Sequence, residues 1–406
     1  MVMSKLLALA GLVVALPTWA GFAAEATHAE AFEARVGTAQ ARLATSLIER
    51  VSAPKKRVVA LSPASLAGAA TALDLGASHQ LRTSLHEVLG FRNSTDSRSD
   101  LELLRERVGG LGQDDRGAGR LRYANSVVVD DGINLYPAVP LALRKAGVDY
   151  LTVDFRSGAA AEKVNKRIRD QTGGLIPEVI DRAPSSASLV VVNALYFNDR
   201  WKTPFDRAAT KPKPFRRFGG GPVIVPTMHL PEGHYLFRRD ARFVAIELPY
   251  ADERFRMVII TTRGERPAPV RAFRAVDEWL NGTGFTSQDG ELELPRFDIS
   301  SREDLTAPLD ALGLRSARLK LGALAGFSDD PIRVTRIVQR VELRLDEEGT
   351  EAAAATAIVV ERGVSPDYVR MLVDKPFVFA LRDVSTGLIL VAGYVGQPRT
   401  IATPTQ

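Results

Sequence analysis

Cysteine does not occur in this chain of 406 residues, and histidine occurs only five times. The absence of cysteine excludes disulfides, thiol catalysis and cysteine-ligated zinc, so packing alone must hold the fold together. The histidines form no H-E-x-x-H pattern, and His229 and His234 have the wrong spacing to share one face of a helix. We therefore expect no bound metal and no other cofactor.

Motifs of catalysis and of nucleotide binding are missing as well. No G-x-S-x-G nucleophile elbow is present. The stretch Ser52-Ala53-Pro54-Lys55 matches the S-x-x-K of penicillin-recognising enzymes, but proline spoils the helix that would aim the lysine, and no S-D-N or K-T-G partner follows. Gly219-Gly220-Gly221 lacks the Lys-Ser/Thr pair that would hold a phosphate. We expect no enzymatic activity.

A strong excess of one charge is also missing. The formal net charge is +5, and Lys and Arg are scattered among Asp and Glu. Two small basic clusters have the composition of loops, and they are Lys55-Lys56-Arg57 and the looser group of Lys211, Lys213, Arg216 and Arg217. Either could contact a polyanion, but no long basic run points to a nucleic-acid partner.

Long hydrophobic runs are absent except at the N-terminus. A lysine precedes an apolar run from Leu6 to Leu16, and small-x-small cleavage sites end at Ala20 and Ala23. We predict a secretory signal peptide over residues 1–23 and a single domain over residues 24–406. The run is too short for a comfortable membrane span. We therefore expect a secreted or periplasmic protein (extracellular space) with no membrane partner.

Helical patterns are concentrated in the first half of the chain. Apolar spacing predicts helices over residues 40–50 and 62–75, the second of which Gly76 ends. A further helix begins near Val164 and is broken at Gly173-Gly174.

Strand patterns are concentrated in the second half. Two strands are predicted earlier, over residues 127–129 and 188–197, and the second is too continuously apolar to have a face in water. The later strands are expected over residues 243–250, 255–261, 291–297, 338–345, 377–381 and 388–395. The pattern predicts an α+β fold with a large mixed or antiparallel sheet.

The segment from Glu347 to Thr356 combines preferences that disagree for a static element. Strand-forming residues precede it, four consecutive alanines follow Glu351, and β-branched residues begin at Ile358. Alanine favours helix, whereas both flanks favour strand. Composition alone leaves a small-residue helix, an exposed loop and a latent strand as alternatives.

Interpreted as a strand, the segment has two distinct faces. Alternate residues from Thr350 to Val360 would face one way and are all uncharged, whereas those from Glu351 to Glu361 would face the other way and carry carboxylates at both ends. Such a segment could become a half-buried strand, with a leading half small enough to enter a narrow gap. Gly349 would allow the backbone rotation needed at the pivot.

Short motifs along almost the whole predicted mature chain resemble those of the serpin family, in the expected order and at the expected separations. They are Ser62-Pro63-Ala64-Ser65-Leu66, Asn193-Ala194-Leu195-Tyr196-Phe197-Asn198-Asp199-Arg200-Trp201 (similar to N-A-[IL]-Y-F-K-G-x-W), Glu247-Leu248-Pro249-Tyr250, Leu294-Pro295-Arg296-Phe297, Phe327-Ser328, Asp374-Lys375-Pro376-Phe377 and Gly393-Tyr394-Val395-Gly396-Gln397-Pro398. The resemblance implies the serpin fold, in which helices pack on a large central β-sheet with two further sheets and an exposed reactive-centre loop, here about residues 347–370.

The resemblance also implies a mechanism, suicide inhibition of serine proteases. A protease attacks the loop and forms an acyl-enzyme, the cleaved loop inserts into the main sheet, and the attached protease is dragged across and distorted. The hinge that would insert first consists of Glu347, Glu348, Gly349, Thr350, Glu351, Ala352, Ala353, Ala354, Ala355 and Thr356.

By the same resemblance, Ser62, Ser65 and Asn193 would control the opening of the sheet, and Trp201 would lie near the entry point of the loop. Arg296 would pair with Glu347, and an exposed pair there would contribute about 0–1 kcal/mol. The polar cluster beneath the sheet usually includes a histidine where this chain has Gln339. Glutamine does not titrate, so we predict no histidine-driven pH control of opening.

The reactive bond has two alternatives. The usual family register places it between Gly363 and Val364, and a loop shorter by one residue places it between Arg362 and Gly363. Arginine before the bond would suit a trypsin-like target, and glycine an elastase-like or subtilisin-like one. We favour Arg362-Gly363, because glycine offers little for a specificity pocket to bind.

One rival function shares the same fold. A non-inhibitory serpin, acting as a carrier, chaperone or storage protein, tends to have bulky or charged hinge residues, whereas this hinge is mostly alanine. We therefore favour an inhibitor that acts as a monomer on a serine protease. The missing cysteines and the simple leader suggest a bacterial secreted member of the family.

Overall fold

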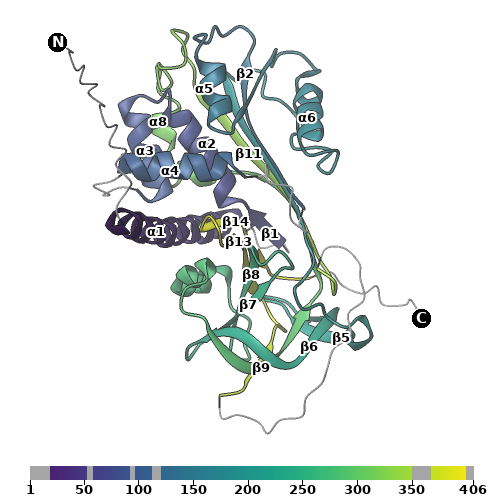
Figure 1. The fold of residues 1–406 in the computed structure, drawn as a ribbon. Helices are drawn as coiled ribbons and strands as arrows, with labels where there is room; N and C mark the ends of the chain where they lie inside the picture. The colour runs from purple at the N-terminus through teal and green to yellow at the C-terminus, as the bar shows by residue number, and fades with distance from the viewer. Residues whose placement is uncertain (1–18, 53–57, 92–96, 112–119, 350–366, 399–406) are drawn as a thin grey trace, which may run out of the picture.

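The computed structural model describes residues 19–52, 58–91, 97–111, 120–349 and 367–398 (Figure 1). A five-stranded sheet runs through the upper body, helices cover it, and a nine-stranded sheet extends into the lower body. The α+β architecture predicted from the sequence is confirmed.

The five-stranded sheet has the order β10-β11-β4-β2-β3. β4 pairs with β11 and β2 with β3 in parallel, whereas the other two pairs are antiparallel. The strands are β2 (Arg120–Asp130), β3 (Asp149–Val153), β4 (Leu189–Asn198), β10 (Phe297–Asp304) and β11 (Val334–Leu345).

β4 lies at the centre of this sheet and has no face in water. Val191 and Leu195 pack into the main core on one side, and Val190 and Val192 into a second cluster beneath helix α6 on the other. The continuously apolar run in the sequence reflects this burial on both faces.

The nine-stranded sheet has the order β1-β14-β13-β8-β7-β6-β9-β12, with β5 added on β6. The two smaller sheets implied by the resemblance are joined through β6, which is long enough to pair with β5, β7 and β9. The strands are β1 (Val58–Leu61), β5 (Lys211–Arg216), β6 (Pro222–Arg239), β7 (Phe243–Pro249), β8 (Phe255–Thr262), β9 (Thr286–Pro295), β12 (Val369–Leu372), β13 (Phe377–Asp383) and β14 (Leu388–Val395).

Most helices lie on one side of the five-stranded sheet, whereas α6 covers the other (Figure 1). The helices on both sides and in the lower body are α1 (Trp19–Val51), α2 (Pro63–Asp74), α3 (His79–Leu89), α4 (Ser97–Gly109), α5 (Val139–Lys145), α6 (Ala160–Gln171), the 3-10 helices η1 (Arg207–Ala209) and η2 (Val270–Asn281), α7 (Thr306–Asp310) and α8 (Arg315–Arg318). No helix in these ranges is long and apolar enough to cross a membrane.

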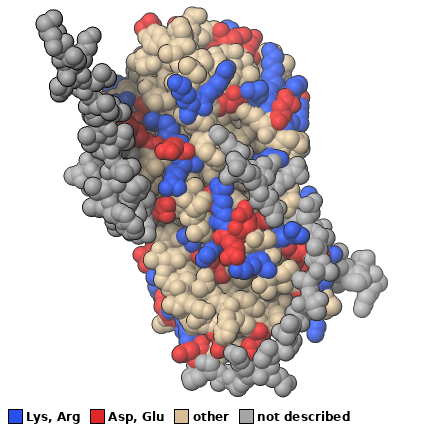
Figure 2. All heavy atoms as spheres, in the orientation of Figure 1, with Lys and Arg blue, Asp and Glu red and all other residues tan. Residues whose placement is uncertain are grey.

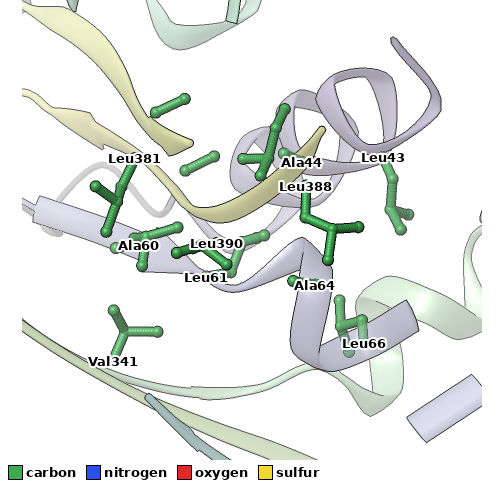
Figure 3. Packing of buried hydrophobic residues seen from close by; sticks show 14 of the residues in the cluster. Leu43, Ala44, Ala60, Leu61, Ala64, Leu66, Val341, Leu381, Leu388 and Leu390 are labelled. Carbon is green, nitrogen blue, oxygen red and sulfur yellow. The ribbon is translucent and has the colours of Figure 1, made fainter. Parts of the chain in front are cut away.

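α2 is the central helix, and its residues from Pro63 to Leu73 are all buried. Ser62 caps its N-terminus by accepting a hydrogen bond from Ser65 N (3.1 Å), and proline follows at the first helical position. Figure 3 shows Leu66 of α2 close to Leu388 of β14 in the core that joins the two sheets. This packing places the N-terminus of α2 directly beneath the five-stranded sheet.

Several boundaries differ from the predictions. The basic residues Lys211, Lys213 and Arg216, expected in a loop, lie on strand β5, because a proline-containing edge strand can still pair where its N–H groups are not needed. The strand expected over residues 291–297 is two strands that meet at Arg296. The helix expected from residue 40 extends back as far as Trp19, the first described residue. The basic cluster at residues 55–57 and residues 1–18 of the predicted leader lie outside the described residues.

Charged side chains are mixed over the surface. In the face shown in Figure 2, Lys and Arg are interspersed with Asp and Glu, as the scattered charges of the sequence predict.

Candidate functional site

The β4–β11 pair forms the middle of the five-stranded sheet. Its parallel register runs from Leu189 opposite Val334 to Phe197 opposite Leu343, with one irregularity near Val334, and it sets Asn193 opposite Gln339. The two strands are therefore hydrogen-bonded along their shared length, and a strand that entered between them would have to separate this ladder.

Three of the residues expected to control opening meet beneath this pair. Gln339 of β11 accepts a hydrogen bond from Ser62 N (2.5 Å) through Oε1 and donates one from Nε2 to Ser62 O (3.1 Å). The hydroxyls of Ser62 and Ser65 are 2.7 Å apart. All three side chains are buried. Gln339 thus fixes β11 to the N-terminus of α2 through neutral groups.

Asn193 of β4 bonds to the neighbouring strand β2 and not to α2. Its Nδ2 donates to Oδ1 of Asn125 on β2, whose own Nδ2 donates to Ser65 O (3.2 Å) and to the Tyr123 hydroxyl (3.0 Å). Asn193 Oδ1 has no hydrogen-bond partner among the described residues. β4 is therefore held to α2 indirectly, through a side chain on the neighbouring strand.

Asn125 and Tyr123 were missed by the sequence reasoning. Asn125 stands opposite Asn193 in the antiparallel register of β2 and β4, and that pairing is not visible in the sequence. Burial raises the pKa of Tyr123 well above its usual value. A Cβ at Gly68 would lie 2.7 Å from the Tyr123 hydroxyl, so glycine on α2 leaves room for this ring. The only available signal was a polar residue before the apolar run of β2.

The chain reverses direction immediately after β11. Asp346 and Gly349 exchange backbone hydrogen bonds (3.0 and 3.3 Å), and Gly349 also forms an antiparallel bridge with Arg200, just beyond the end of β4. Gly349 therefore lies between the ends of the two central strands and forms an antiparallel bridge to a residue just beyond each of them.

Only glycine fits at this position. Gly349 has φ of 109°, and a Cβ there would lie 2.4 Å from Asp199 O and 2.5 Å from Arg200 Cα. Both the backbone conformation and the close approach of another backbone exclude larger residues.

Trp201 is packed against this turn. Its Nε1 donates to Asp346 O (3.0 Å), and its backbone N donates to Glu348 O (3.1 Å). The indole stacks on Tyr250, with ring centroids 4.4 Å apart and planes at 19°. The residues expected near the entry point therefore form one aromatic and backbone-bonded contact at the end of the β4–β11 pair.

Glu347 is buried, and this changes the expected weight of its ion pair. Its Oε1 accepts hydrogen bonds from Arg296 Nε (2.7 Å) and from the Thr210 hydroxyl, whereas its Oε2 is buried and has no partner among the described residues. The glutamate side chain is 1% exposed and that of Arg296 is 40% exposed. Loss of the arginine would leave a buried carboxylate with one neutral donor, which is more costly than loss of an exposed pair.

Two further carboxyl groups lie at this turn. Glu348 pairs with Arg207 of η1 at 2.7 Å. Asp199 accepts a hydrogen bond from Arg200 N (2.8 Å), and burial raises the pKa of Asp199 to about 6, with the nearby Asp252 adding to the rise. The family motif quoted above has glycine where this chain has Asp199, so this carboxyl group is a departure from the motif.

The hinge from Thr350 to Thr356 and the alternative reactive bonds at Arg362, Gly363 and Val364 lie outside the described residues. The chain is described again from Asp367 and enters β12, which pairs in parallel with β9.

Comparison with known proteins identifies the family. Residues 38–398 match the family model described as "Serpin (serine protease inhibitor)". Human neuroserpin is 27% identical over 364 residues, covering 85% of this chain and 87% of that protein. Plasminogen activator inhibitor 1 of Neovison vison is 27% identical over 391 residues, covering 89% and 94%.

The fold agrees with that assignment. The crystal structure of human thyroxine-binding globulin matches with a TM-score of 0.78 and 23% identity, covering 90% of this chain and 99% of that one, which shows a shared fold. With the family model extending from α1 to the end of the last strand, and with a glycine turn at the end of a parallel central strand pair, the chain belongs to the serpin family.

Proposed function

We propose that this protein is an irreversible inhibitor of serine endopeptidases, which traps its target when the cleaved loop inserts between β4 and β11. The observation that carries the proposal is the position of Gly349, bridged both to Asp346 after β11 and to Arg200 after β4. Both bridges are antiparallel, so a strand continuing from Gly349 would run antiparallel to both neighbours.

Insertion would be favourable in this sheet. The parallel ladder between β4 and β11 would be replaced by two antiparallel ladders, and parallel pairing is slightly less stable for each residue. About a dozen inserted residues, each gaining a backbone hydrogen bond of about 0.5–1.5 kcal/mol net, would release about 10 kcal/mol. A release of that size can compete with deacylation of the trapped enzyme.

The hinge composition supports insertion. The residues of one strand face from Thr350 to Val360 are uncharged, and alanines make up most of the leading half. These side chains can enter the interior of the sheet without burying an unpaired charge. A carrier or storage protein with the same fold has no need of such a segment.

We assign the reactive bond to Arg362-Gly363 and the target to a trypsin-like enzyme, with Gly363-Val364 and an elastase-like or subtilisin-like enzyme as the alternative. A similar protein is named as an inhibitor of plasminogen activator. Incubation with trypsin followed by mass spectrometry would identify the cut, and a released peptide that begins at Gly363 is expected.

The central experiment looks for a covalent complex that survives SDS electrophoresis. We expect one with the unmodified protein, and cleavage without a complex for Thr350→Arg, because the arginine would have to enter the sheet. Glu351→Arg is the matched control, since its side chain would face the other way, and it should still form the complex. Cleavage without a complex by trypsin, elastase and subtilisin alike would favour a non-inhibitory binding, chaperone or storage protein.

The site of action is part of the same proposal. We propose a leader over residues 1–23 that is cleaved, a monomeric secreted or periplasmic protein, and a bacterial source. The N-terminal pattern and the absence of cysteine support this proposal. The relatives named above come from animals and add no support for a bacterial source. N-terminal sequencing of the exported protein would test the leader, and a start before Ala20 would contradict it.

A further inference from the structure

A cavity of about 350 Å³ lies beside β12, the strand that the chain enters after the loop. β12 contributes Val369, Arg370 and Leu372 to its wall, β8 contributes Thr262, and the residues between β12 and β13 contribute Lys375. The volume is at the lower end of the range for small-molecule sites. Nothing in the loop-insertion mechanism uses this cavity.

Cations dominate the wall of this cavity. Five come from five different parts of the fold, and two acidic residues, Glu265 and Asp374, accompany them. The cations are Arg216, Arg239, Arg263, Arg370 and Lys375. Convergence of cations from separate elements on one concave surface favours an anionic ligand.

The neighbouring carboxylates do not match these cations one for one. Asp374 is shared between Arg216 (2.5 Å) and Lys375 (2.8 Å). Arg263 donates to a neutral partner, the backbone oxygen of Asp240, at 2.6 Å. Arg370 pairs with Glu291 at 2.7 Å and Arg239 with Asp367 at 3.5 Å, so these two are largely neutralised. Arg263 therefore has a neutral partner, Lys375 shares its carboxylate with Arg216, and Glu265 is the wall carboxylate that remains beside them.

Two buried polar groups lie in the same wall. The Lys375 side chain is only 5% exposed, and its ammonium group has three donors, of which Asp374 takes one. Thr262 Oγ1 is buried and has no hydrogen-bond partner among the described residues. Buried polar groups are normally hydrogen-bonded, so an acceptor placed in the cavity would supply what both groups need.

We propose that this cavity binds a small multivalent oxyanion of the phosphate class, held by Lys375, Arg263 and Thr262. Guanidinium groups match the geometry of phosphate oxygens, and a lysine adds a compact point charge. The bound anion would also lie against β12, which contributes Val369, Arg370 and Leu372 to the same wall, and would connect it to the end of β8 and to the segment before β13.

Binding would stabilise the anchoring of the loop. β12 has four residues and pairs only with β9 among the described strands. Just after it, the chain is held by backbone hydrogen bonds from Val373 N to Glu293 O (2.9 Å) and from Arg216 N to Asp374 O (2.8 Å). An anion in contact with β8 and β13 would reduce the local opening of β12. This consequence does not depend on protease inhibition.

Titration calorimetry with pyrophosphate, at constant ionic strength, tests the site. We expect saturable binding with one site per chain, and at least a tenfold loss of affinity in Arg263→Gln and in Thr262→Val. Arg266→Gln is the matched control, because it removes the same charge from an exposed position three residues away that is not part of the wall, and its affinity should be unchanged.

Hydrogen exchange of residues 368–372 provides a second measurement. Pyrophosphate should slow exchange there in the unmodified protein and in Arg266→Gln, but not in Arg263→Gln. Absence of saturable binding, or equal losses of affinity in Arg263→Gln and Arg266→Gln, would overturn the proposal and indicate only a general attraction to a basic surface.

Discussion

Two groups of polar residues lie at different points of the same strand pair, and they are built from different chemistry. Beneath the middle of the β4–β11 pair, Asn193 and Gln339 bond only through amide, hydroxyl and backbone groups. At its end, Glu347 and Asp199 place carboxyl groups in the interior beside the Gly349 turn. The difference implies that pH and salt act on the end of the strand pair and leave its middle unaffected.

The largest effect is expected from Gly349→Ala. The new Cβ would meet the backbone of Asp199 and hold a strained φ, so we expect the free energy of unfolding to fall by about 3 kcal/mol. Urea unfolding measures it. Gly313→Ala is the control, because Gly313 has φ of 103° but open space around its Cβ position. Equal losses in the two variants would show that the close approach at Gly349 contributes nothing.

Asn193→Ala tests the neutral cluster. It would leave Asn125 Oδ1 without its donor and should lower the free energy of unfolding by about 1–3 kcal/mol. Because no group in this cluster titrates near neutrality, the loss should be the same throughout pH 5–8. Unfolding curves across that range would contradict the comparison if they showed a transition that disappears in this variant.

Asp199→Asn tests the charged end. The pKa of Asp199 is about 6 in the folded protein and near 4 when unfolded, so the folded state binds the proton more tightly. The protonated carboxyl group supports the fold below about pH 4, and that contribution is lost as pH rises through 6. The free energy of unfolding of the variant should therefore equal that of the unmodified protein at pH 4 and exceed it by about 1–2 kcal/mol at pH 7.5.

The outcome that would sink this assignment is a pH-independent difference between Asp199→Asn and the unmodified protein. Asp252→Asn is a useful companion, because Asp252 contributes to the raised pKa. Asp252→Asn should raise the free energy of unfolding at pH 7.5 as well, but by less than Asp199→Asn does.

The smallest effect is expected from Arg296→Gln. The buried Glu347 would keep only neutral donors. We therefore expect the free energy of unfolding to fall by about 1–2 kcal/mol at low salt, and by less as the salt concentration rises. Arg302→Gln is the matched control, since Arg302 is 39% exposed but its partner Glu178 is 52% exposed. For Arg302→Gln, we expect the free energy of unfolding to change by no more than about 0.5 kcal/mol. Similar losses in both variants would show that burial of Glu347 does not matter.

The elements read most accurately from the sequence are those with strong local patterns. In α2, the serine cap and the small residues indicate a buried helix that begins at Pro63. In β4, the apolar run indicates a strand that is buried on both faces. By contrast, β5 and β6 contain prolines and charges, and they become strands by pairing, β5 with β6 and β6 also with β7 and β9. Their stability is tertiary, so a local pattern could not reveal it.

The candidate site divides in the same way. Motif resemblance pointed to Ser62, Asn193 and Trp201, which lie along one strand pair in the structure. The role of Asn125 depends on the register between two strands. The contacts of Glu347 depend on Thr210, between η1 and β5, and on Arg296, between β9 and β10. These features follow from the assembled fold, and no spacing in the chain encodes them.

The pairing of β4 with β11 also has a consequence for biosynthesis. β4 is complete at Asn198, but its partner begins only at Val334. At roughly 5–20 residues per second, synthesis of the intervening chain takes on the order of ten seconds. Throughout that time one edge of an apolar strand has no partner, and such edges invite aggregation. We expect the nascent chain to depend on a chaperone from about the emergence of β4 until β11 arrives.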